Sequence, residues 1–348
     1  MNFPSHLLMY CLFVWLVTLL LTCWMRHYAS VNQVLDIPNQ RSSHSVPTPR
    51  GGGLAIVIGF LIALTVLTIM VSLPMNSTLA MGAGSLVAAI GWLDDHDHVP
   101  ARWRFMTHLL VASLALILLK GLPWLWIPAP FDGWLNRHLL NLSWLGYPLG
   151  VLFLVWCLNL FNFMDGTDGI AASEALFVAL ALGGFLYPID SGLSAVCFSL
   201  AAASLGFLCW NWPRAKIFMG DVGSGFLGLL LGILMLMAAQ QAAVLLYCGL
   251  ILFGLFLVDA TYTLSVRFST GQKWYDAHCS HTYQRAAKRF GHLAVLLASW
   301  GINLCWLLPI AYWVFLHPSH ALAGLLVAYS PLLALAHAFK AGQIDQTS

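Results

Sequence analysis

Three short segments place carboxylates where metal or phosphate chemistry needs them. Asp94 and Asp95 end a GWLDD segment, Asp165 and Asp168 belong to NLFNFMDGTDG, and Asp221 lies in FMGDVGS. Adjacent carboxylates repel each other, so such a pair suits a general base or a Mg²⁺ site. The alternatives are a polar helix end for the pair and a helix N-cap for Asp221.

Two further segments carry histidine and arginine. His44 and Arg50 lie in a stretch rich in proline and glycine, and His278, His281 and Arg285 lie in KWYDAHCSHTYQR. Imidazole and guanidinium groups bind phosphate oxygens or support proton transfer. Alternatively, the second segment is a basic stretch that contacts anionic lipid headgroups.

The elements that must position these residues are membrane-spanning helices. Of 348 residues, 60% are apolar and 8% are charged, whereas a soluble protein has about 25% charged residues. The sequence therefore excludes a soluble enzyme, and a net charge of +2 gives no sign of nucleic-acid binding. The eight cysteines form no CxxC pair and are typical of small apolar residues.

Apolar runs of spanning length predict one all-α integral membrane domain over residues 1–348, a polytopic helical bundle with ten or eleven transmembrane helices. The runs are 7–24, 53–73, 79–93, 105–120, 146–161, 170–188, 191–209, 223–240, 243–264, 292–315 and 319–339.

The basic residues predict the orientation of the bundle. With the N-terminus outside, 13 of the 15 Lys and Arg residues fall on the cytoplasmic side, as the positive-inside rule requires. The predicted cytoplasmic loops are 25–52, 94–104, 162–169, 210–222 and 265–291.

Four of these loops, 94–104, 162–169, 210–222 and 265–291, place seven of the 13 acidic residues at this one face, and carboxylates beside hydrocarbon are usually functional. A secondary transporter is the alternative, because Glu174 and Asp259 lie inside predicted spans where a proton relay would use them. A transporter would, however, hold its charges near the middle of the membrane.

Taken together and in this order, these segments resemble the polyprenyl-phosphate N-acetylhexosamine-1-phosphate transferase family over about residues 36–292. The resemblance implies transfer of N-acetylhexosamine-1-phosphate from a UDP-sugar to undecaprenyl phosphate, with release of UMP. It implies Mg²⁺ as cofactor, with Mn²⁺ as an alternative, and a site on the cytoplasmic face of the bacterial inner membrane. The partners are the lipid acceptor, the nucleotide sugar and the membrane, with no nucleic acid; a homodimer is also considered.

The resemblance assigns a role to each matching position. It implies metal ligands at Asn162 and Asp221, catalytic carboxylates at Asp94, Asp95, Asp165 and Asp168, a catalytic His281, and substrate contacts from His44, Arg50, Asn211, Phe218, His278 and Arg285. Ser280 stands where the family's H-x-H-H motif has a histidine. This departure argues against the peptidoglycan translocase and favours an enzyme that initiates a lipopolysaccharide of the O-antigen type.

Overall fold

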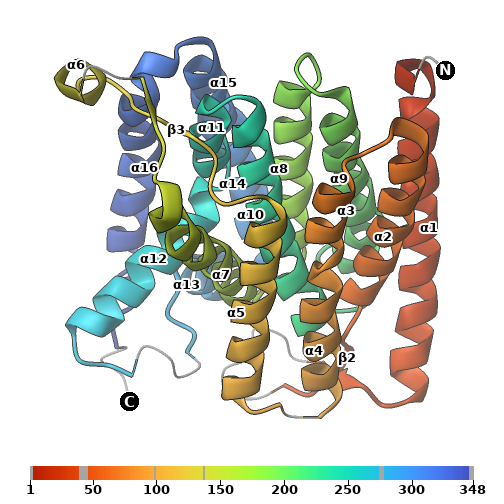
Figure 1. Cartoon of the computed structure of the whole chain (residues 1–348). Coiled ribbons are helices and arrows are strands. Elements are labelled where there is room, and N and C mark those ends of the chain that lie inside the picture. Colours follow the sequence, from red (N-terminus) through yellow and green to blue (C-terminus); the bar gives the residue numbers. More distant parts are fainter. Residues whose placement is uncertain (1–2, 39–45, 98, 136–137, 274–277, 345–348) are drawn as a thin grey trace.

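The computed structural model describes residues 3–38, 46–97, 99–135, 138–273 and 278–344. Helices dominate the fold and form a bundle (Figure 1). The α-helices are α1 (Phe3–Val31), α2 (Gly53–Val71), α3 (Met75–Gly82), α4 (Gly84–His96), α5 (Ala101–Leu118), α6 (Phe131–Leu135), α7 (Gly146–Met164), α8 (Ile170–Leu186), α9 (Ser191–Asn211), α10 (Asp221–Gln241), α11 (Val244–Leu252), α12 (Gly254–Ser269), α13 (Thr282–Phe290), α14 (His292–Ile302), α15 (Leu308–Leu316) and α16 (Ala321–Ala338).

The remaining elements are short. They are the strands β1 (Leu35–Asp36), β2 (Thr48–Pro49), β3 (Leu125–Trp126) and β4 (Leu139–Leu140), the 3₁₀ turns η1 (Ser143–Leu145) and η3 (Pro318–His320), and the π-helical turn η2 (Asn303–Leu307). Strand β1 pairs antiparallel with β2, and β3 pairs antiparallel with β4.

The all-α membrane fold expected from the sequence is confirmed. Within the described residues, eight helices are long and apolar enough to cross a membrane, and the pair α11 and α12 adds a ninth if it counts as one span. That pair is bent by 72°, although the sequence predicts one continuous helix there. The predicted spans 79–93 and 170–188 are also helical, but α3, α4 and α8 are each shorter than 18 residues. Ten or eleven full-length spans are therefore not observed among the residues that the structure describes.

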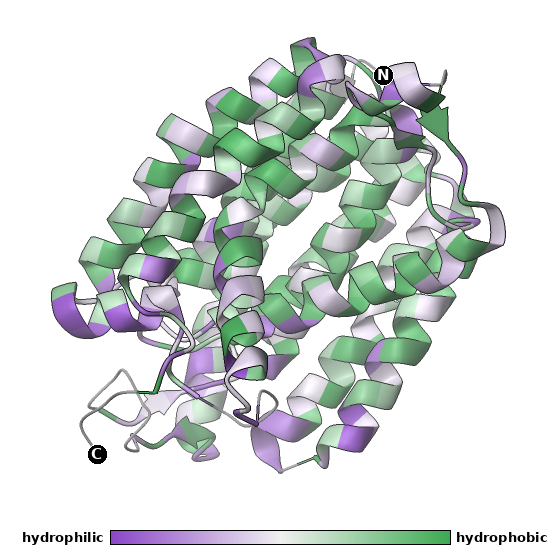
Figure 2. Ribbon diagram, turned by 90° about the vertical axis from the view of Figure 1, so that its left-hand side faces the viewer, coloured by the Kyte–Doolittle hydropathy of each residue, from purple (hydrophilic) through white to green (hydrophobic). Residues whose placement is uncertain are grey.

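The bundle surrounds helix α10. The most apolar stretch of α10 is completely buried, whereas only 17% of the corresponding stretch of α1 is buried. Helix α10 packs against α2, α4, α7, α8 and α11. Figure 2 shows helix walls that are mainly apolar, with polar segments gathered toward the ends of the bundle, most clearly at its lower end. A lipid-facing outer surface and a packed centre follow from this distribution.

The polar end of the bundle is tied together by backbone hydrogen bonds between distant segments. The N–H of Phe218 donates to the carbonyl of Pro49 at 2.8 Å, and the N–H groups of Gly52 and Gly53 donate to the carbonyls of Phe218 and Met219 at 2.9 and 2.8 Å. The segment before α2 and the segment before α10 are therefore held side by side.

Candidate active site at the polar end of the bundle

One cavity brings most of the predicted site residues together. It has a volume of about 300 Å³ and lies where the ends of α4, α7 and α9 meet the start of α10. The predicted residues that line it are Arg50, Asp95, Asn162, Asp165, Asp168, Asn211, Phe218 and Asp221. Because these positions are up to 171 residues apart, only the packing of the helices can assemble them.

Close packing between α4 and α10 sets the geometry of the cavity. A side chain at Gly91 would lie 2.5 Å from the backbone of Asp221, so only glycine permits this approach. Gly220 has a φ of +77°, and a Cβ there would lie 2.3 Å from a carboxylate oxygen of Asp95. Two glycines therefore allow the end of α4 to touch the start of α10.

Asp95 stabilises the N-terminus of α10. Its Oδ1 accepts the N–H of Asp221 at 3.1 Å, and its Oδ2 accepts the N–H of Val222 at 3.3 Å. Carboxylates are favourable at helix N-termini, where N–H groups lack partners in the helix. Burial, followed by the negative charge of Asp221, raises the pKa of Asp95 to about 7.

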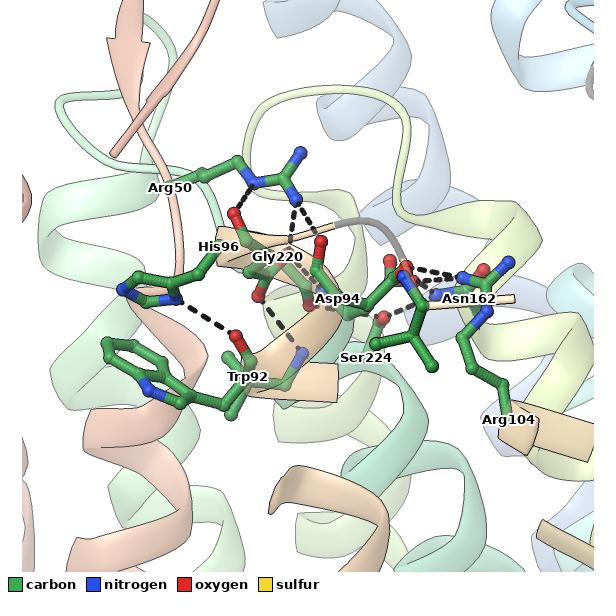
Figure 3. A network of polar contacts seen from close by, with 12 residues as sticks. Arg50, Trp92, Asp94, His96, Arg104, Asn162, Gly220 and Ser224 are labelled. Atoms are coloured by element: carbon green, nitrogen blue, oxygen red, sulfur yellow. Dashed lines mark hydrogen bonds and ion pairs between the residues drawn. The ribbon is translucent and has the colours of Figure 1, made fainter. Parts of the chain in front are cut away.

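Arg50 connects the loop before α2 to the end of α4. Its Nε donates to the carbonyl of Asp95 at 3.0 Å, and one Nη donates to the carbonyl of Asp94 at 2.9 Å (Figure 3). The same Nη lies 3.2 Å from the Asp95 carboxylate. Arg50 therefore fixes the end of α4 and also places a positive charge at the cavity.

Asp221, the first residue of α10, is held by two side chains from other helices. The amide of Asn162 donates to its Oδ1 at 3.0 Å and to the hydroxyl of Ser224 at 2.9 Å. Arg104 donates to its Oδ2 at 2.9 Å and to Asp94 at 2.5 Å (Figure 3). Asp94 itself is not among the residues that line the cavity, and Arg104 links it to Asp221.

Asp165 and Asp168 line the cavity from the turn between α7 and α8. Asp168 accepts the N–H of Ala215 at 3.1 Å, and His292 lies 3.2 Å from its other oxygen. Burial, followed by the charges of Asp221, Asp95 and Asp168, raises the pKa of Asp165 well above its usual value. The two carboxylates therefore differ in environment, although the sequence analysis assigns both of them the same catalytic role.

Asn211 joins two of the loops that surround the cavity. Its Oδ1 accepts the N–H of Gly169 at 2.9 Å, and its Nδ2 donates to the carbonyl of Ile217 at 2.8 Å. Only 4% of this residue is exposed. Phe218, which lines the same cavity, presents an aromatic ring beside it.

The histidine segment leads into α13, a helix that the sequence did not reveal. His281 is 1% exposed, and its Nδ1 lies 3.4 Å from Asp259. Asp259 also accepts the N–H groups of Thr282 and Tyr283 at 2.9 and 3.0 Å. His281 does not line the 300 Å³ cavity, so the structure places it as a buried anchor at the start of α13.

Two other predicted substrate contacts, His278 and Arg285, belong to the same segment. Burial, followed by the charges of His281 and Arg267, lowers the pKa of His278 to about 4, and its Nδ1 lies 3.0 Å from the hydroxyl of Ser280. Arg285 donates to the carbonyl of Gln343 at 2.5 Å and does not line the cavity. His44 lies outside the described residues.

Comparison with known proteins places this arrangement in a family. The sequence profile of glycosyl transferase family 4 matches residues 76–239. A probable undecaprenyl-phosphate N-acetylglucosaminyl 1-phosphate transferase of Bacillus subtilis is 32% identical over 276 residues, which are 78% of this chain and 74% of the relative. The chain belongs to the polyprenyl-phosphate N-acetylhexosamine-1-phosphate transferase family.

Other relatives match over shorter stretches. A decaprenyl-phosphate N-acetylglucosaminephosphotransferase of Mycolicibacterium smegmatis is 34% identical over 62% of this chain and 56% of its own. A phospho-N-acetylmuramoyl-pentapeptide-transferase of Moorella thermoacetica is 37% identical over 56% of this chain and 62% of its own. Relatives named for two kinds of sugar donor thus match this chain.

The cavity residues of this family member are suited to a Mg²⁺ site in which substrate oxygens supply the remaining ligands. In the described part of the chain, no three His, Cys, Asp or Glu side chains are grouped to hold a metal by themselves. Asp221, Asn162 and Ser224 instead offer hard oxygen atoms within one hydrogen-bonded group. Mg²⁺ is usually bound through one or two carboxylates together with substrate phosphates and waters.

Family membership also bears on the acidic residues inside the bundle. Glu174 accepts a hydrogen bond from the amide of Asn303 at 2.7 Å, and Asp259 caps α13. Both carboxylates therefore take part in contacts between segments of the bundle, and family membership favours a transferase over the transporter interpretation.

Several residues that line the cavity were missed by sequence reasoning. They are Ser224 on α10, Cys279, and Gln284 and Lys288 on α13. Gln284 and Lys288 are four residues apart and so share one helix face. This spacing would have identified them if the helix itself had been predicted.

Proposed function

We propose that this protein transfers N-acetylhexosamine-1-phosphate from a UDP-sugar to undecaprenyl phosphate and releases UMP. The product is the lipid diphosphate on which a cell-surface polysaccharide of the O-antigen type is built. The observation that carries the proposal is the cavity in which Asp165, Asp168 and Asp221 face Arg50 and Lys288 at the polar end of a membrane bundle. Family membership supports sugar-1-phosphate transfer to a polyprenyl phosphate.

The proposed chemistry is a direct phosphoryl transfer. An oxygen of the lipid phosphate attacks the β-phosphorus of the UDP-sugar, the bond from this phosphorus to the bridging oxygen breaks, and UMP leaves with that oxygen. The new diphosphate joins lipid and sugar. When bound, Mg²⁺ would offset the negative charge of the donor's diphosphate.

The residues of this chain then orient the two substrates. Arg50 and Lys288 supply positive charge for phosphate oxygens. Phe218 offers an aromatic face to the uracil ring. Asp221, held by Asn162, keeps its carboxylate toward the position where the diphosphate would lie. Positioning of this kind accounts for most of the catalysis in phosphoryl transfer.

A second cavity supports a lipid acceptor. It has a volume of about 340 Å³ and a lining that is almost entirely apolar. Helix α13 separates the two cavities, because Gln284 and Lys288 line the polar one while Ala286 and Phe290 line the apolar one. An isoprenoid chain in the apolar cavity would bring its phosphate toward the polar one.

The proposed location is the bacterial inner membrane, with the site on the cytoplasmic side. The support comes from the loops of the site end, which carry most of the Lys and Arg residues of the chain. Ser280, which bonds to His278, supports a simple N-acetylhexosamine donor over one that carries a muramyl peptide.

The proposal is tested with the purified full-length protein in detergent. We expect UMP release from UDP-N-acetylglucosamine that requires both undecaprenyl phosphate and Mg²⁺, and much slower release from UDP-N-acetylmuramoyl-pentapeptide. Faster use of the pentapeptide donor would overturn the proposed substrate. Absence of UMP release from every UDP-N-acetylhexosamine would overturn the proposed activity.

A further inference from the structure

Arg104 connects two carboxylates that the sequence separates by 127 positions. One Nη of its guanidinium donates to Asp94 at 2.5 Å and to Asp221 at 2.9 Å (Figure 3). The side chains are partly shielded from water, with exposures of 30% for Arg104, 11% for Asp94 and 34% for Asp221. A single cationic group therefore bridges two carboxylates at the rim of the cavity.

The two contacts of Arg104 differ in kind. Asp94 is fixed, because its other oxygen accepts the N–H of Val99 at 2.8 Å, and it does not line the cavity. Asp221 lines the cavity, and its other oxygen accepts the amide of Asn162. The longer of the two Arg104 contacts is thus the one made to the carboxylate that faces substrate.

We propose that Arg104 is an internal counter-ion that a divalent cation must displace from Asp221, and that Asp94 holds Arg104 when this happens. The inference rests on the proposed function, since it takes Asp221 to be a ligand of the cation. Arg104 and Asp94 are positioning residues in this scheme, because both act on the site through Asp221.

The scheme predicts opposite effects for two charge-removing substitutions. Arg104→Gln leaves Asp221 without its cationic partner, so a divalent cation has no competitor and should bind more tightly. Asp94→Asn removes the carboxylate that shares Arg104, so the guanidinium is left to Asp221 alone and a divalent cation should bind more weakly. A structural role alone would weaken binding in both variants.

Titration of the full-length protein in detergent with Mn²⁺ tests the counter-ion role without turnover. The electron paramagnetic resonance signal of the free ion reports how much Mn²⁺ is bound. Titrations are made with and without UMP. We expect the Kd of Arg104→Gln to fall about fivefold and the Kd of Asp94→Asn to rise by about the same factor, the size of a partly exposed ion pair. The double variant should behave as Arg104→Gln alone.

Arg102→Gln is the matched control. Arg102 lies in the same helical turn, and its guanidinium lies over the ring of Trp103 at 5.7 Å, so its loss should leave the Kd within about twofold of the wild-type value. Equal Kd values in all variants, or weaker binding in both single variants, would overturn the counter-ion role while leaving the proposed function in place. Failure of the wild type to bind Mn²⁺, with or without UMP, would overturn both.

Discussion

The carboxylate of Asp95 accepts the backbone N–H of Asp221 at 3.1 Å. Asp95 therefore holds the start of α10, and Asp221, the first residue of that helix, lines the cavity. The two carboxylates have different tasks, because Asp95 is 6% exposed and bonded to α10, whereas the carboxylate of Asp221 is bonded to the side chains of Arg104 and Asn162, which a ligand can replace.

Replacement of Asp221 should abolish activity. Asp221→Asn removes the charge that the proposed Mg²⁺ site needs, and we expect UMP release to fall at least about a hundredfold. Asp97→Asn is the control, because Asp97 is an exposed acid just after α4 that does not line the 300 Å³ cavity. Activity of Asp221→Asn within tenfold of the wild type would mean that the metal is held elsewhere.

Replacement of Gly91 should disturb the junction of α4 and α10. In Gly91→Ala the new Cβ would lie 2.5 Å from the backbone of Asp221, and such overpacking costs about 1–3 kcal/mol. We expect a lower thermal unfolding midpoint in detergent. Gly82→Ala is the matched control, because a Cβ at Gly82 meets nothing within 4 Å; equal midpoints for the two variants would contradict the close approach.

Replacement of His292 should weaken binding of the nucleotide sugar. His292 lies 3.2 Å from Asp168, and without it the carboxylate loses a partner that fixes its orientation. We expect His292→Ala to raise the KM about tenfold, with a smaller effect on kcat. His317→Ala, an exposed histidine that does not line the cavity, should leave KM unchanged. A KM in His292→Ala equal to that of the control would mean that Asp168 is positioned without His292.

The stability of the metal-free protein should depend on the protonation of Asp95. Its pKa is raised from 3.8 to about 7 in the folded state, so folding is favoured by proton binding. This contribution is complete below about pH 4 and is lost as the pH rises through about 7. In EDTA, the unfolding midpoint of the wild type should therefore fall more steeply between pH 5 and 8 than that of Asp95→Asn. Parallel curves would show that burial does not raise this pKa.

The sequence predicts the membrane fold and most of the cavity, because both depend on local signals. Apolar runs mark the helices, and polar residues at one end of several spans must meet when the helices pack. Arg50, Asn162, Asp168 and Asp221 line the cavity as expected.

The features that the sequence did not reveal depend on contacts between distant segments. Helix α13 forms where Asp259, 22 residues before His281, accepts N–H groups at its start. The same contact turns His281 inward and away from the cavity. The sequence predicts a catalytic carboxylate at Asp94, but it does not reveal that Arg104 from α5 links Asp94 to Asp221.

In the proposed reaction, the phosphate next to the sugar moves to the lipid together with the sugar. The most direct test uses UDP-N-acetylglucosamine labelled with ³²P at the β-phosphate, incubated with the purified protein, undecaprenyl phosphate and Mg²⁺. We expect the label to enter the lipid product and the released nucleotide to be unlabelled UMP. Label recovered in UDP, with an unlabelled lipid product, would show transfer of the sugar alone and would overturn the proposed reaction.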